Sequence, residues 1–146
     1  MKKNVYFVSG IDTNIGKSYA TAYLARVWRE KGINVITQKF IQTGNPAGYS
    51  EDIELHRRLM GLEYLPEDEQ GWTKPEIFSY PASPDLASRI DNRAVDFDKI
   101  NHATSVLSER FDAVLVEGAG GLMVPLTPDC LSLIHISEPT RHAQIS

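Results

Sequence analysis

The sequence predicts an α/β fold in which a parallel sheet is flanked by helices. Three short apolar runs, at residues 5–8, 35–36 and 113–116, have the composition of strands that are buried on both faces. Apolar residues at helical spacing follow the first run and precede the third. This alternation of buried strands with one-sided helices is typical of α/β proteins.

The first three elements form one unit. The strand Val5 to Val8 leads through a polar loop, Gly10 to Gly16, into a helix that we expect from Lys17 to Lys31. One face of this helix carries Ala20, Leu24, Val27 and Trp28. Gly32 is a natural stop, and a second strand with Val35 and Ile36 ends near Lys39. We expect a βαβ unit with a right-handed crossover.

The middle of the chain is less regular. Glycines, Asn45 and Pro46 make Gln42 to Tyr49 a loop, after which Ser50 opens a helix ending near Met60. We expect residues 62–83 to be irregular, with an extended piece from Ile77 to Tyr80. The remaining expected elements are a helix from Phe97 to Phe111, a strand from Ala113 to Val116 and a short strand within Leu122 to Leu126.

The last sixteen residues, LSLIHISEPTRHAQIS, resemble a translated cloning adapter rather than a domain segment. We therefore expect an α/β domain over residues 1–130, incomplete at its C-terminus, and a non-native tail over 131–146. The alternative is a natural strand at Leu131 to Ile136 with a polar tail.

Composition excludes several classes of protein. The net charge of −4 and pI of about 5.5, without a basic cluster, argue against nucleic-acid binding. The lone Cys130 cannot form an internal disulfide. Four histidines lack metal-site spacing and are expected to be solvated or packed: His56, His102, His135 and His142. No segment is long and apolar enough to span a bilayer, so a cytoplasmic location is expected.

The strongest functional signal is the run Gly10-Ile11-Asp12-Thr13-Asn14-Ile15-Gly16-Lys17-Ser18 between a strand and a helix. Backbone N–H groups of such a loop, with the helix N-terminus, form a phosphate cradle. Lys17 would reach the outer phosphates and the Ser18 hydroxyl could bind Mg²⁺. Five residues separate the glycines instead of the usual four, and the structural alternative is a simple glycine turn. The expected fold is P-loop NTPase-like.

A second signal is Glu117, which ends a strand and precedes Gly118-Ala119-Gly120-Gly121. Ligands of open parallel sheets bind beyond the carboxyl ends of the strands, where Glu117 would lie. Its carboxylate and Ser18 could both bind Mg²⁺, which prefers oxygen ligands. Asp112 lies at the wrong end of the strand. The alternative for Glu117 is a solvated turn residue. Asp52 alone is best explained as a carboxylate at a helix N-terminus. A lysine at a strand end, such as Lys39, is usually exposed, yet this end faces the ligand side of the sheet.

Together these features resemble dethiobiotin synthetases. The resemblance covers about residues 4–128 and rests on five segments in the same order: GIDTNIGKS, Lys39 with Thr43-Gly44, Ser50-Glu51-Asp52, Pro81-Ala82-Ser83-Pro84, and VEGAGGLMVPL. The family loop has the same five-residue spacing. The resemblance implies a ligase of biotin biosynthesis that uses ATP and CO₂ to carboxylate 7,8-diaminopelargonic acid and close its ring, giving dethiobiotin, ADP and phosphate.

The resemblance also implies site residues, with Mg²⁺ as cofactor and a homodimer for the full-length protein. Lys39 and Lys17 would be catalytic, Thr43 and Ser83 would bind substrate, and Ser18, Asp52 and Glu117 would bind the metal. The implied ATP contacts are Thr13, Asn14, Ile15, Gly16, Lys17, Ser18, Tyr19, Asp52, Glu117, Gly118, Ala119 and Gly120. Many relatives carry glutamate where this chain has Asn14, so no role is assigned to a carboxylate there.

Two rival functions stay open. A relative of the cobyrinic acid amidating synthetases also activates a carboxylate-like oxygen with ATP, but would continue into a glutamine-amidotransferase domain. A partitioning-type ATPase switch typically has an extra lysine at the start of the loop, where this chain has Val8-Ser9-Gly10-Ile11.

The family's C-terminal third supplies adenine contacts, dimer contacts and residues for the partner's substrate site. We therefore expect the 146-residue chain to bind nucleotide weakly and to turn over poorly or not at all. An assay of ADP release by this chain checks the expectation, and rapid diamine-dependent release would contradict it.

Overall fold

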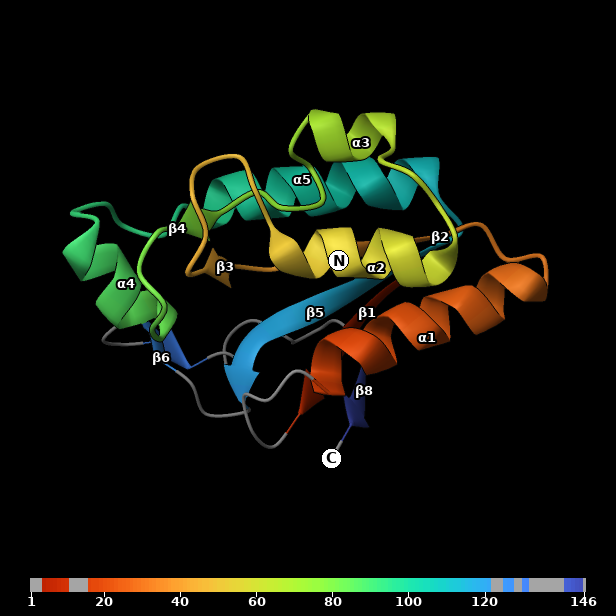
Figure 1. Ribbon diagram of the computed structural model, residues 1–146, viewed down its shortest axis with the longest axis horizontal. Coiled ribbons are helices and arrows are strands. Elements are labelled where there is room, and N and C mark those ends of the chain that lie inside the picture. The colour runs from red at the N-terminus through yellow and green to blue at the C-terminus, as the bar shows by residue number, and fades with distance from the viewer. Residues whose placement is uncertain (1–3, 11–15, 122–124, 128–129, 132–140, 146) are drawn as a thin grey trace.

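The computed structural model describes residues 4–10, 16–121, 125–127, 130–131 and 141–145, with side chains over 4–9 and 16–119. Its centre is a parallel sheet of four strands in the order β2-β5-β1-β8 (Figure 1). These are β1 (Val5–Gly10), β2 (Val35–Lys39), β5 (Ala113–Gly121) and β8 (Arg141–Ile145). The predicted α/β class and parallel sheet are confirmed.

Helices cover both faces of the sheet (Figure 1). On one face, α1 (Gly16–Glu30) and α2 (Glu51–Met60) pack on strand residues such as Val8, Val35 and Leu115. On the other, α5 (Phe97–Arg110) packs on residues such as Val5 and Val114. Successive side chains of a strand point to opposite faces, so a strand covered on both sides buries every side chain and is mostly apolar. This explains the continuous apolar runs in the sequence.

The ends of α2 follow from local sequence. Ser50 precedes the helix and its Oγ accepts a hydrogen bond from the Ile53 amide at 3.2 Å. Gly61 follows the helix in the left-handed conformation, with φ of 75°. A serine cap satisfies an N–H group that has no partner within the helix, and glycine adopts positive φ without strain. The predicted bounds of α2 are confirmed, and α1 also begins and ends within one residue of its prediction.

The predictions for the connecting segments were partly wrong. Gln42–Thr43, expected to be loop, forms β3 and pairs in parallel with β4 (Ile77–Phe78). The irregular segment contains the single-turn helix α3 (Pro66–Glu69), and α4 (Pro84–Ile90) was not foreseen. Elements of two to seven residues show too little periodicity to be recognised in a sequence. Both short helices begin with proline, a residue favoured at the first helical position.

The later strands also differ from expectation. β5 extends to Gly121, well beyond Val116, and β6 (Pro125–Thr127) pairs antiparallel with β7 (Cys130–Leu131). Residues 122–124 of the expected strand lie outside the described part. β8 lies within the expected tail and pairs in parallel with β1. The domain boundary at residue 130 stays a prediction, and residues 132–140 lie outside the described part.

A buried ion pair ties α2 to the sheet and to α3. Arg57 donates from Nε and Nη2 to the two carboxylate oxygens of Asp68, each at 2.8 Å, and also to the Thr37 carbonyl of β2 at 3.1 Å. Asp68 also accepts hydrogen bonds from Thr73 Oγ1 and the Leu65 amide. Both charged side chains are almost fully buried, so each depends on the other for its compensation.

We expect Asp68→Asn to lower the free energy of unfolding by about 3 kcal/mol at pH 7, because it leaves the buried Arg57 without a compensating charge. Burial opposes the ionisation of Asp68, but the Arg57 guanidinium outweighs it and lowers the pKa of Asp68 below 3.8. A lowered pKa stabilises the fold above the unfolded-state value and loses this effect as pH falls. Denaturant unfolding should therefore show the full difference at pH 7 and a narrowing gap below about pH 3.8.

The control is Glu30→Gln, which removes the exposed ion pair between Arg26 and Glu30 and should change stability by less than about 0.5 kcal/mol. Equal effects of the two substitutions would contradict the assignment of Asp68 as a structural ion.

Candidate active site at the carboxyl end of the sheet

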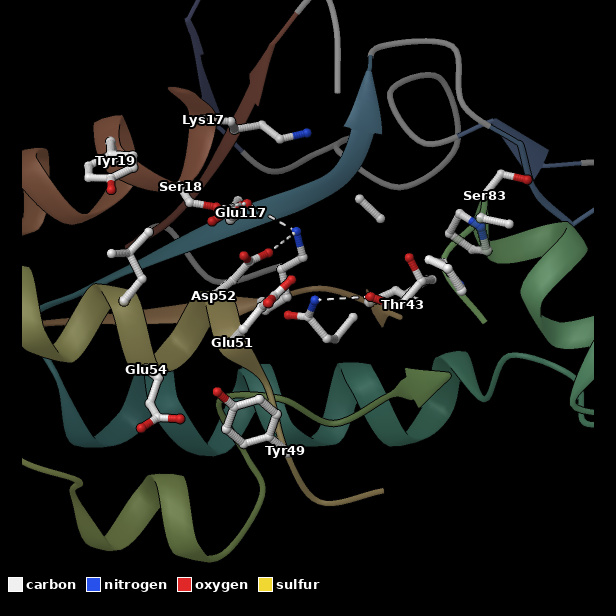
Figure 2. Close-up of a pocket in the computed structure, with 18 of the residues that line it drawn as sticks. Lys17, Ser18, Tyr19, Thr43, Tyr49, Glu51, Asp52, Glu54, Ser83 and Glu117 are labelled. Carbon is white, nitrogen blue, oxygen red and sulfur yellow. Dashed lines mark hydrogen bonds and ion pairs between the residues drawn. The ribbon is translucent and has the colours of Figure 1, made fainter. Parts of the chain in front are cut away.

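A cavity of about 770 Å³ lies at the carboxyl ends of β2 and β5, beside the first turns of α1 and α2 (Figure 2). The Pro81–Pro84 segment forms part of its wall. The cavity brings together most of the described residues that the sequence suggested for the site. Those residues are Lys17, Ser18, Tyr19, Lys39, Thr43, Asp52, Ser83, Glu117 and Ala119.

Some predicted residues are not among those that line the cavity. Gly16 and Gly118 are described and are not part of its wall. Thr13, Asn14 and Ile15 lie outside the described residues, and only the backbone of Gly120 is described. The roles assigned to all of these residues stay predictions.

The register of β2 against β5 places the two central charges of the site. Lys39 is the last residue of β2 and lies directly opposite Glu117 of β5. On each strand, alternate side chains point to the face covered by α1 and α2: Val35, Thr37 and Lys39 on β2, and Ala113, Leu115 and Glu117 on β5. The ammonium and the carboxylate therefore share a face at the same level of the sheet.

Lys39 forms two ion pairs (Figure 2). Its Nζ is 2.8 Å from Asp52 Oδ2 and 3.0 Å from Glu117 Oε2, and it also donates to the Gly118 carbonyl at 3.4 Å. Burial disfavours the charged amine, but the carboxylates of Glu117 and Asp52 outweigh burial and raise the pKa of Lys39. Lys39 is thus a fixed cation, suited to holding anions rather than to accepting protons.

Asp52 owes its position to the start of α2, where it is the second residue after the Ser50 cap. Its carboxylate is next to the positive end of the helix dipole, as the sequence indicated. No local pattern indicated that the same carboxylate also pairs with Lys39. Lys39 is 6 % exposed and lines the cavity, so the alternative of an ordinary exposed strand-end lysine is excluded.

The two oxygens of Glu117 have different partners. Oε2 accepts from Ser18 Oγ at 2.9 Å and from Lys39, while Oε1 lies 2.7 Å from His56 Nε2. Burial opposes the ionisation of Glu117, but the Lys39 ammonium and the contact with His56 lower the pKa of Glu117 well below its ordinary value. Glu117 is therefore a buried carboxylate and not a solvated turn residue. Asp112 comes just before β5, at the opposite end of this strand from the cavity, as predicted. Its Oδ2 accepts a hydrogen bond from the Asn34 amide.

Sequence reasoning missed His56, which is fully buried between β2 and Glu117. The prediction of a solvated or packing histidine was correct only for packing. The sequence did hold a signal that His56 faces the site. Asp52 and His56 are four residues apart on α2, so they lie on one face of the helix.

The opposite wall carries Thr43, at the end of β3, and Ser83, just before α4 (Figure 2). Gly44 has φ of 80°, and a Cβ at this position would be 3.0 Å from Pro81 Cβ. The glycine thus permits the close approach of the Pro81 segment, which brings Ser83 toward Thr43. The spacing of these residues in the sequence could not show this proximity.

At Gly118, glycine is required because there is no space for a side chain. A Cβ at this position would lie 2.8 Å from Phe7 Cε1 of β1, so a side chain would overpack the core.

Among the described residues, no group of three or more His, Cys, Asp or Glu side chains could hold a metal ion by itself.

We expect Lys39→Met to raise the pKa of Glu117, because the substitution removes the buried cation that favours its ionised form. The measurement is a ¹³C NMR titration of the Glu117 carboxyl group in both proteins. The control is Lys74→Met, since the Lys74 ammonium donates to the Gly48 carbonyl and the Tyr64 hydroxyl. A Glu117 carboxyl that titrates at the same pH with and without Lys39 would contradict the assigned ion pair.

No helix in the described part of the chain has both the length and the apolar character to cross a membrane. The comparisons with known proteins agree with the fold. A family model described as an AAA domain matches residues 4–138.

Curated relatives carry the name ATP-dependent dethiobiotin synthetase. The chain is 45 % identical over 134 residues to the protein BioD 2 of Pasteurella multocida (strain Pm70), covering 92 % of this chain and 62 % of the relative. It is 50 % identical over 138 residues to BioD of Chlorobaculum tepidum, covering 94 % and 57 %. For BioD 2 of Haemophilus influenzae the identity is 45 % over 132 residues, covering 90 % and 69 %.

The chain thus spans between 57 % and 69 % of the length of these curated relatives. The matched region includes the two strands, the two helix starts and the Pro81–Pro84 segment that build the cavity. With this coverage and identity, the chain belongs to the dethiobiotin synthetases, within the AAA domain family.

Proposed function

We propose that the protein carboxylates 7,8-diaminopelargonic acid with CO₂ and closes its ring with ATP, giving dethiobiotin, ADP and phosphate. The observation that carries the proposal is the shared cavity. One wall of the cavity holds Lys17, Ser18 and the buried Lys39, and the opposite wall holds Thr43 and Ser83. The names of the relatives support this function over the amidating synthetase and the partitioning ATPase.

The proposed reaction has three steps. One amine of the substrate attacks CO₂ and loses a proton to give a carbamate. A carbamate oxygen then takes the γ-phosphoryl group of ATP, so that ADP leaves and a mixed anhydride forms. The second amine attacks the anhydride carbon, the ring closes and phosphate leaves.

The main obstacle in the second step is repulsion between the carbamate and the γ-phosphate, both of which are anions. Fixed positive charge at the point of transfer lowers this barrier, especially where water is excluded. Lys39 provides such a charge because Asp52 and Glu117 keep it protonated and oriented. We propose Lys39 and Lys17 as the catalytic cations.

The residues beside Lys39 also fit a Mg²⁺ ion. Ser18 Oγ is 2.9 Å from Glu117 Oε2, and Asp52 Oδ2 shares the Lys39 ammonium with that same oxygen. Three hard oxygen donors, two of them carboxylates, match the preference of Mg²⁺, with phosphate oxygens and water completing its shell. When bound, the ion would neutralise charge on the phosphates. We propose Ser18, Asp52 and Glu117 as its protein ligands.

Thr43 and Ser83 are the proposed substrate contacts, and residues 13–19 and 118–120 the proposed nucleotide contacts. A homodimer and a cytoplasmic location, where ATP is abundant, complete the proposal.

The test is release of ADP and formation of dethiobiotin with Mg²⁺, bicarbonate and ATP, with and without diaminopelargonic acid. It is run on this chain and on a chain in which residues 131–146 are replaced by the C-terminal region of the Haemophilus influenzae relative. We expect diamine-dependent turnover in the chimeric protein and a loss of at least about 100-fold in Lys39→Ala, because a preorganised charge is removed.

Lys31→Ala is the matched control, because Lys31 is exposed just beyond α1 and should leave turnover unchanged. ADP release that ignores the diamine would indicate a P-loop ATPase of another kind. It would also remove the basis for Thr43 and Ser83 as substrate residues.

A further inference from the structure

His56 has no part in the function proposed above, yet it makes the shortest contact to Glu117. The imidazole is fully buried, with Nε2 at 2.7 Å from Glu117 Oε1 and Nδ1 at 2.8 Å from Thr37 Oγ1. It therefore connects strand β2 to the carboxylate of β5 through helix α2.

The donors available favour one direction for each hydrogen bond. Arg57 Nη1 can only donate, and it lies 2.8 Å from Thr37 Oγ1, which must accept. The Thr37 hydroxyl proton is then free to point to His56 Nδ1. An Nδ1 that accepts leaves the ring proton on Nε2, where it donates to Glu117 Oε1. The series of donors begins at Arg57, held by Asp68, and ends on Glu117.

This series has a consequence for the geometry of Glu117. With Oε1 engaged by His56, only Oε2 is directed to Ser18 and Lys39. A carboxylate held by one oxygen alone could rotate about its terminal torsion, which has broad energy wells. Hydrogen-bond partners behind metal-binding side chains commonly fix such orientations, and their loss typically weakens metal affinity 10- to 100-fold.

We propose that His56 is a positioning residue that holds Glu117 Oε2 toward the metal and nucleotide. The proposal rests on Glu117 as a Mg²⁺ ligand in the function proposed above. The competing view is that His56 is a satisfied core residue that only attaches α2 to β2. The two views differ in what a substitution does to metal binding when the fold is kept.

The first experiment measures binding of Mn²⁺ in the presence of a non-hydrolysable ATP analogue, by titration calorimetry and electron paramagnetic resonance. His56→Leu removes the donor, and we expect it to weaken Mn²⁺ at least tenfold. His56→Gln restores a donor N–H near the position of Nε2 and should return affinity to within about threefold of the native value, because the donor to Glu117 is kept. His102→Leu, an exposed histidine of α5, is the control and should change nothing.

Glu117→Gln separates failure of this proposal from failure of the function it rests on. Native Mn²⁺ affinity in Glu117→Gln would remove Glu117 from the metal site. The proposed Mg²⁺-ligand role of Glu117 and the positioning role of His56 would then both be wrong. Weakened binding in Glu117→Gln with native binding in His56→Leu would overturn the positioning role alone. Equal losses of Mn²⁺ affinity in His56→Leu and His56→Gln that follow their thermal stabilities would support the purely structural view of His56. They would overturn the positioning role.

The second experiment needs no nucleotide. Long-range ¹H–¹⁵N NMR spectra of the chain distinguish a ring nitrogen that carries a proton from one that does not. We expect His56 Nε2 to carry the proton and Nδ1 to lack it. A proton on Nδ1 alone would leave Nε2 unable to donate to Glu117, and the proposal would be wrong.

Discussion

The ion pair between Lys39 and Glu117 is the interaction on which the rest of the site depends. It exists because the last residue of β2 lies opposite Glu117 in the parallel ladder. Side chains alternate between faces along a strand, so a register shift of one residue would send one of the two charges into the apolar layer under α5. The register is strongly specified because both faces of these strands are buried, with Val35 and Ile36 on β2 and residues 113–116 on β5 forming the apolar part.

Two buried charges are tolerated only when their remaining partners are also in place. Asp52 supplies a second carboxylate to Lys39, while Ser18 and His56 occupy the oxygens of Glu117. Behind them, Arg57 and Asp68 tie α2 to β2 and α3. The functional cluster and the structural ion pair thus share one helix. A disturbance of either is expected to affect the other, because Arg57 also contacts Thr37.

The other wall of the cavity is built differently. Thr43 and Ser83 come from short elements, and their proximity depends on Gly44, which allows the Pro81 segment to approach. The cavity therefore has a charged wall at the main sheet and the starts of α1 and α2, and a wall of small polar groups from β3 and the segment before α4. This division fits a site that holds an anionic nucleotide on one side and an organic substrate on the other, as proposed.

The sequence by itself determined the strands β1 and β2, the start of β5, and the helices α1, α2 and α5, because each has a local signal. Apolar runs predict buried strands, and caps such as Ser50 and Gly61 predict helix ends. It also identified Ser18, Lys39 and Glu117 as chemistry-bearing residues. Only the tertiary structure decided that β5 lies between β1 and β2, that Asp52 pairs with Lys39, and that His56 contacts Glu117, 61 residues away. Such pairings join segments distant in the chain and leave no trace in a local window, and α3, α4 and β3 are too short to show a period.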